Sequence, residues 1–194
     1  MSTFGTTNDL RTLQALALSR YLTESAISGS FYLFVSKGNP YSGDDTVPDE
    51  LPVIETARAD DIANPLFFKK VNKSGANSQM RFVVPDPNGN ITLYSQRYRE
   101  IDDVDIFTEG VRHVYIEVEI PANDIILSDT VRGFNLIADL YTTAGNLATG
   151  DSYLASEINL DNTLGNRLIY LENKAKYERI QTEAGELVRI IFAV

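Results

Sequence analysis

The sequence predicts a β-rich α+β fold, mostly an antiparallel β-sandwich, with one principal helix near the N-terminus. Three observations predict it. One N-terminal segment has apolar residues at helical spacing, the rest of the chain consists of short β-prone runs between Pro, Gly and Asn residues, and one run alternates apolar and polar residues. We expect residues 1–194 to form a single domain, because a chain of 194 residues can build a core without a metal or a disulfide.

The predicted helix covers residues 8–28 and follows a polar segment, residues 1–7, that we expect to be a flexible tail. Asn8 or Asp9 can cap its first turn, and Gly29 supplies a residue suited to its end. The apolar residues at helical spacing are Leu10, Leu13, Ala17 and Tyr21, and those that keep one side polar are Thr12, Ser19 and Thr23. We expect this helix to lie over a sheet.

Strand signals dominate after the helix. Residues 31–35 are apolar on both faces, which is typical of a central strand. Residues 66–68, after Pro65, fit either a short buried strand or the start of a helix. Two β-prone runs, residues 80–84 and 91–95, flank Asn88-Gly89, and this arrangement predicts a hairpin because Asn and Gly tolerate positive φ.

The clearest strand is residues 112–120. Its apolar face is predicted to carry Val114, Ile116, Val118 and Ile120, and its wet face His113, Tyr115, Glu117 and Glu119. Pro121 ends it. Further strands are predicted at residues 133–142, 168–171, 177–181 and 187–194. We expect the last two to form a hairpin around the glycine-containing loop 182–186.

Composition excludes several classes of function. The chain has 17 Lys and Arg against 27 Asp and Glu, a formal charge of −10, which speaks against binding nucleic acid or attaching to a membrane through a basic patch. It has no cysteine, so disulfides, thiolate nucleophiles and Cys-ligated zinc are excluded. No apolar run approaches the roughly 20 residues that span a bilayer, and no secretory signal is recognisable. We expect a soluble protein made in a reducing compartment.

No catalytic residue is predicted. The single histidine, His113, is expected on the wet face of its strand beside Glu117 and Glu119, and no Gly-x-Ser-x-Gly motif accompanies it. No glycine-rich phosphate-binding loop is present. A hydrolase that uses a pair of Asp or Glu carboxylates is the remaining enzymatic alternative.

Two acidic clusters are candidates for a cation. Asp86, Asn88 and Asn90 occupy alternate positions, as calcium ligands do, but the glycine is misplaced and the twelfth position is Arg97. The second cluster is Asp102, Asp103 and Asp105, which we interpret as an acidic turn leading into a strand at Ile106-Phe107. We expect neither a metal nor another cofactor.

Several short blocks, in the same order along the chain, resemble a family of phage proteins. They are residues 19–22, 31–37, 40–41, 112–120 with 132–134, 165–173 (Gly-Asn-Arg-Leu-Ile-Tyr-Leu-Glu-Asn), Arg179, 181–183 (Gln-Thr-Glu) and 187–192. The family is the baseplate wedge subunit of T-even-like contractile-tailed bacteriophages, the product of the eighth baseplate gene. The chain departs from it at Lys174-Ala175-Lys176, where the family has a basic, proline-containing segment.

The resemblance implies a non-enzymatic structural subunit of the virion's tail baseplate, assembled in the host bacterial cytoplasm. It also implies other baseplate wedge proteins as partners, and a homodimer, since the family is dimeric. Family members insert a second β-rich domain, whereas residues 86–110 can hold only a short hairpin or loop. The chain therefore resembles a shortened wedge subunit.

A binding module is the alternative to the structural subunit. Ten Tyr and nine Phe residues could supply stacking surfaces for a host-surface glycan, as in a tail module that recognises the host. The absence of Trp weakens that alternative, because such platforms would have to rest on Tyr and Phe alone.

Overall fold

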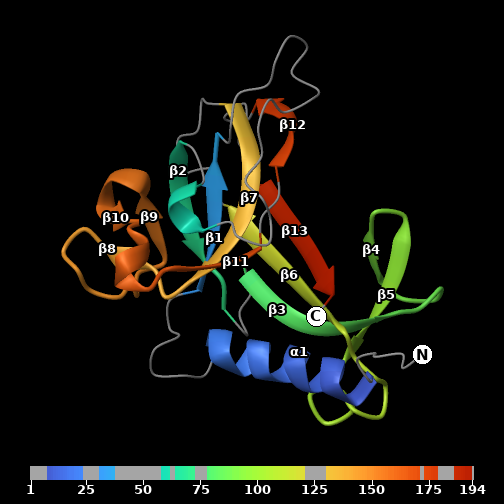
Figure 1. Cartoon of the computed structure of the whole chain (residues 1–194). Coiled ribbons are helices and arrows are strands. Elements are labelled where there is room, and N and C mark those ends of the chain that lie inside the picture. The colour runs from blue at the N-terminus through green and yellow to red at the C-terminus, as the bar shows by residue number, and fades with distance from the viewer. Residues whose placement is uncertain are drawn as a thin grey trace, which may run out of the picture.

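The computed structural model describes residues 8–23, 31–37, 58–61, 64–72, 78–120, 130–170, 173–178 and 186–193. In these residues it has one α-helix and two larger antiparallel sheets, so the predicted β-rich α+β class is confirmed (Figure 1). The predicted tail, residues 1–7, and the predicted helix residues 24–28 lie outside the described residues.

The first sheet has the strand order β11-β7-β1-β2-β9, and β12 also pairs with β7. Its strands are β1 (Phe31–Ser36), β2 (Pro65–Lys70), β7 (Thr130–Ala138), β9 (Ser152–Leu154), β11 (Arg167–Tyr170) and β12 (Asn173–Glu178). β1 lies between β2 and β7, and all six of its residues are buried. The prediction of a central strand at residues 31–35 is therefore confirmed, and the ambiguous run after Pro65 is a strand.

The second sheet has the order β13-β6-β3-β5-β4. Its strands are β3 (Ser78–Pro85), β4 (Ile91–Leu93), β5 (Gln96–Ile101), β6 (His113–Ile120) and β13 (Glu186–Ala193). The strands β4 and β5 form a hairpin that projects from the end of β3, on the right in Figure 1. The even-numbered residues of β6 are buried as predicted, but Tyr115 on the opposite face is buried as well.

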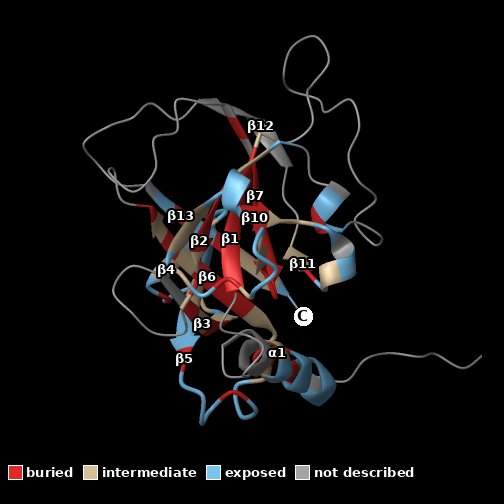
Figure 2. Cartoon of the chain, turned by 90° about the vertical axis from the view of Figure 1, so that its left-hand side faces the viewer, coloured by how far each residue is buried: buried red, intermediate tan, exposed pale blue. Residues whose placement is uncertain are grey.

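A small lobe, residues 139–166, packs on the first sheet. It contains β8 (Tyr141–Thr142) paired with β10 (Ile158–Asn159), and the short 3-10 helices η2 (Ala155–Glu157) and η3 (Asn162–Leu164). Another 3-10 helix, η1 (Ala59–Asp61), contributes Ala59 to the core beneath this lobe. Figure 2 shows the first sheet as the buried layer behind this part of the chain.

The first sheet is the middle layer because alternate residues of its strands enter two different cores. Phe31, Leu33 and Val35 of β1 pack with the second sheet in one core. Tyr32 and Phe34 point the other way, into the core shared with the lobe, where Phe34 stacks on Phe68 with ring centroids 4.6 Å apart. Two-sided burial explains why the sequence of β1 shows no alternation.

The helix α1 (Asn8–Thr23) lies across the end of the second sheet (Figure 1), but with a different face inward from the one predicted. Thr12 and Ala15 are buried, whereas Leu10 and Leu13 are about half exposed and Ala17 is exposed. The predicted apolar stripe is therefore wrong. The small side chains of Thr12 and Ala15 bring the helix close to the core, and Leu16 and Leu18 pack at its margin.

Neither predicted hairpin is correct. The runs on either side of Asn88-Gly89 do not pair, because β5 lies between β3 and β4, and the hairpin turn is instead Tyr94-Ser95, both with positive φ. The C-terminal pair fails for a similar reason, since β12 joins the first sheet and β13 the second. In both cases local turn chemistry was outweighed by long-range strand pairing.

Two other predicted strands differ from the structure. The strand expected over residues 133–142 ends at Ala138, because Asp139 has φ of 55° and sends the chain into the lobe. Residues 106–107 do not begin a strand, since the whole segment 103–110 is a series of turns with Ile106 buried beneath it. Of the predicted C-terminal strands, β11 and β13 match the described parts of residues 168–171 and 187–194. β12 includes residues 177–178, and the rest of the predicted strand 177–181 lies outside the described residues.

Candidate interaction surfaces

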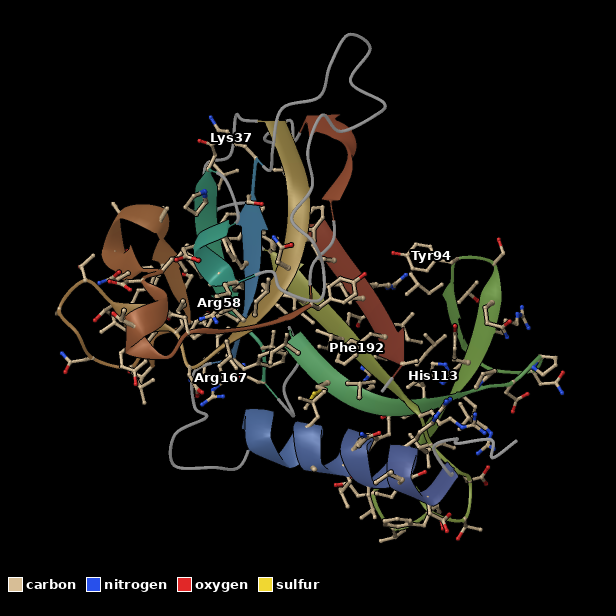
Figure 3. All side chains as sticks on the ribbon, in the orientation of Figure 1. Lys37, Arg58, Tyr94, His113, Arg167 and Phe192 are labelled. Atoms are coloured by element: carbon tan, nitrogen blue, oxygen red, sulfur yellow. The ribbon has the colours of Figure 1, made fainter. Side chains whose placement is uncertain are left out.

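His113 lies on the outer face of the second sheet, at the base of the β4–β5 hairpin (Figure 3). Its ring meets the edge of Tyr98, with centroids 5.9 Å apart, although β3 separates their two strands. The two side chains therefore meet over β3. Burial, and then the charge of Arg112, hold the pKa of His113 below its usual range. The prediction of a solvated histidine is wrong, because His113 is half-buried and Nδ1 is enclosed.

Glu117 belongs to a separate cluster on the same face. Tyr115 donates its hydroxyl to Glu117 Oε2 at 2.6 Å, and Arg189 Nε of β13 donates to the same oxygen at 3.0 Å. Burial works to raise the pKa of Glu117, but the two hydrogen bonds outweigh it and the pKa is lowered. Burial and the same carboxylate raise the pKa of Tyr115. The cluster fastens β13 to β6, and the Tyr115 hydroxyl and the Arg189 guanidinium both have Glu117 as their partner.

The calcium-like cluster at Asp86 is a turn held by hydrogen bonds to the Asp86 carboxylate. Asp86 Oδ1 accepts the Asn88 backbone N–H at 2.8 Å, and Oδ2 accepts Arg99 Nε at 3.0 Å. These two hydrogen bonds, the backbone one first, lower the pKa of Asp86. Both carboxylate oxygens thus serve the turn and its attachment to β5, and Asn88 and Asn90 are exposed.

The second acidic cluster lies on an exposed turn. Asp102 accepts the Asp105 backbone N–H through its carbonyl at 2.9 Å, and Asp105 accepts that of Glu109 in the same way. Arg99 Nη2 reaches Glu109 at 2.9 Å and so joins this turn to β5 as well as to Asp86. Among the described residues, no group of three or more His, Asp or Glu side chains could hold a metal ion.

The lobe is fastened to the first sheet by polar contacts as well as by its core. Lys69 of β2 pairs with Asp151 at 2.9 Å, and Arg167 of β11 pairs with the buried Asp139 at 3.0 Å. Tyr32 donates its hydroxyl to the Gly150 carbonyl at 2.7 Å, and burial is the main cause of its raised pKa. These contacts join segments that are far apart in the sequence, so the lobe and the sheet form one body.

The surface also carries a set of large apolar side chains whose exposure the sequence did not indicate. Within the described residues they are Leu10, Leu13, Tyr94, Val104, Phe107, Leu154 and Leu187. Four of them belong to just two segments, α1 and the turn 103–110. Leu10 and Leu13 were expected in the core, and only the small size of Thr12 and Ala15 on the neighbouring face could have indicated otherwise.

The described residues therefore combine charged side chains that pair with one another, two acidic turns and several exposed large apolar side chains, and such side chains are typical of an interaction surface. No described helix is both long and apolar enough to cross a membrane.

Comparison with known families makes the assignment specific. The family model described as baseplate wedge 3 tail fiber network component matches residues 5–191, nearly the whole chain. The chain belongs to this family, and is a structural component of a phage tail baseplate that acts with other baseplate proteins. The predicted assignment to the baseplate wedge is confirmed. A search of curated proteins finds no match.

Proposed function

We propose that the protein is a non-enzymatic spacer of the baseplate wedge, holding neighbouring wedge proteins in register during assembly and contraction. The observation that carries this proposal is the family match over residues 5–191, which includes both sheets, the helix and the lobe. Its partners are other wedge proteins, and neither nucleic acid nor a membrane is among them, in keeping with the charge of −10.

The way the layers are joined supports a stiff spacer. The first sheet is packed on both faces, so neither the lobe nor the second sheet can shift without disturbing a fully buried strand. Ion pairs from Lys69 and Arg167 tie the lobe to the first sheet, and the Tyr115–Glu117–Arg189 cluster ties β13 to β6. A rigid body of this kind keeps the proteins bound at its two sides at a fixed distance and orientation.

We further propose that the chain is a compact counterpart of the T-even-like wedge subunit encoded by the eighth baseplate gene. Residues 86–110, where that family inserts a second domain, hold only β4, β5 and the turn 103–110. The homodimer and the assembly in the host bacterial cytoplasm that the resemblance implies are part of this proposal.

Mass spectrometry and cross-linking of purified intact particles test the proposed function. We expect this chain in every tailed particle, at a fixed copy number, with cross-links to at least two different baseplate proteins. Cross-links between two proteins of the same wedge should be found both before and after contraction of the tail. Tailed particles that lack the chain, or contain it without cross-links to baseplate proteins, would refute the proposal.

A further inference from the structure

The exposed apolar side chains of α1 and of the turn 103–110 form a surface that we call the helix–turn patch. It consists of Leu10 and Leu13, which are 47% and 49% exposed, and of Val104 and Phe107, which are 87% and 47% exposed. An isolated exposed leucine needs no explanation, but four large apolar side chains on two adjacent elements are a feature of interaction surfaces.

The two segments of the helix–turn patch lie side by side. Figures 1 and 2 both place the turn beside the N-terminal half of α1, although almost ninety residues separate them in the sequence. Their inward-facing residues belong to one core, because Ala15 of the helix lies in the same large cluster as Ile106 and Val111. Both segments are thus anchored to the same core, and their exposed apolar side chains lie outside it.

Acidic residues border the helix–turn patch. Within residues 8–18 and 102–110 there are five acidic residues, Asp9, Asp102, Asp103, Asp105 and Glu109, and one basic residue, Arg11. All five acidic residues are exposed, and the carboxylate of Glu109 is shared with Arg99. An apolar centre with a negative rim is complementary to an apolar surface with a positive rim.

From this geometry, and resting on the proposed function, we propose that the helix–turn patch docks a lysine- or arginine-rich segment with apolar anchors, carried by a different baseplate protein. A second copy of this chain fits less well, because a two-fold contact through the patch would place its acidic rim against the same acidic rim. We take Leu13 and Phe107, which are 49% and 47% exposed, as one anchor from each segment for the variants below.

Footprinting and zero-length cross-linking of intact particles test the docking directly. We expect Leu10, Leu13, Val104 and Phe107 to be oxidised by hydroxyl radicals in the free chain and protected in the particle. We expect carbodiimide to join Asp102 or Asp105 to a lysine of another baseplate protein. Leu154, which is exposed on the lobe, is the reference for surface outside the patch.

Three alternative outcomes would each overturn the docking proposal, and each can be told apart from the others. A chain present in the particle with an unprotected patch leaves the spacer function standing and removes the docking surface. Cross-links from Asp102 or Asp105 to a second copy of the chain identify a self-contact instead. Protection already present in the free chain, and lost when residues 1–7 are deleted, shows that the chain's own N-terminal segment covers the patch.

Variants separate the apolar from the charged contribution. Leu13→Ser with Phe107→Ser should reduce incorporation into particles by tenfold or more, whereas the matched control Leu154→Ser with Leu187→Ser should leave it unchanged. Asp102→Lys with Asp105→Lys should reduce incorporation, and Glu119→Lys on the outer face of the second sheet should not. Thermal denaturation confirms that each variant is folded. Equal incorporation of the patch variants and their controls would contradict the proposal.

Discussion

Replacement of Gly89 by alanine tests how the turn before β4 is fitted against the second sheet. Gly89 is buried, and a Cβ atom added to it would lie 2.1 Å from the Tyr98 carbonyl oxygen and 2.2 Å from its carbon. Cβ atoms in proteins essentially never approach another atom closer than 3.0 Å, so the backbone of β5 must retreat by about 0.9 Å. The obstacle is main chain within a sheet, which cannot rotate away as a side chain can.

The expected cost of Gly89→Ala follows from this overlap. Overpacking that the surroundings can partly absorb costs about 1–3 kcal/mol, and we expect the upper end here, about 3 kcal/mol. The movement also strains the hydrogen bonds from Gly89 N to Asp86 O and from Asp86 N to Arg97 O, at 2.9 and 3.0 Å. With a urea m-value of about 2 kcal/mol/M, the unfolding midpoint should fall by roughly 1.5 M.

Urea denaturation of the purified chain measures this cost, with Gly145→Ala as the matched control. Gly145 has φ of +78° and open space around its missing Cβ, so alanine there should cost only the left-handed backbone penalty, about 1 kcal/mol. If Gly89→Ala costs no more than Gly145→Ala, the close approach of the turn to β5 is not a determinant of stability and the reasoning is refuted.

Three further predictions concern other parts of the molecule. Ser95→Gly should raise the free energy of unfolding by about 0.5–1 kcal/mol, because Ser95 has φ of 66° in the β4–β5 turn; an unchanged urea midpoint would speak against that turn. Phe34→Ala should lower stability by about 3–5 kcal/mol, since its fully buried ring stacks on Phe68 under the lobe, and a loss below 1 kcal/mol in thermal or urea unfolding would contradict this packing. The single histidine should titrate by NMR below the usual pKa of about 6.5, because burial disfavours the charged imidazole of His113. Stability should therefore decline as the pH falls below about 6.5, since the unfolded chain then binds a proton that the folded chain does not. His113→Gln should remove the part of this decline that precedes the acidic range in which Asp86 and Glu117 take up protons.

The parts of the fold predicted from the sequence are those fixed by local pattern. The alternation of residues 112–120 identified β6, and the unbroken apolar run of residues 31–35 identified the central strand β1. The strand period and the number of packed faces account for the burial of β1 and of the even-numbered residues of β6, but not for the buried Tyr115.

The strand partners could not be predicted in the same way. Asn88-Gly89 looks like a hairpin turn, yet Gly89 is there because the chain passes close to the backbone of β5. The true hairpin turn, Tyr94-Ser95, carries no glycine and gives no sequence signal. The last two strands enter different sheets, which is decided by pairing with β7 and β6 far away in the chain.

The interaction surface was missed for a related reason. Helical spacing shows that apolar residues share a face but not that this face is packed inward, and here tertiary packing buries Thr12 and Ala15 instead. Phe107 was expected in a strand. Alternate residues of a strand point to opposite faces, so an exposed Phe107 there would not have indicated an interaction surface. In the turn 103–110, the buried residue is its neighbour Ile106, and Phe107 is turned outward.

The most direct measurement of the central claim is electron microscopy of particles produced by phage that cannot make this chain. A spacer that holds wedge proteins in register predicts particles with absent or incomplete baseplates, restored when the wild-type chain is supplied from a plasmid. Intact, contractile baseplates formed in its complete absence would contradict the account.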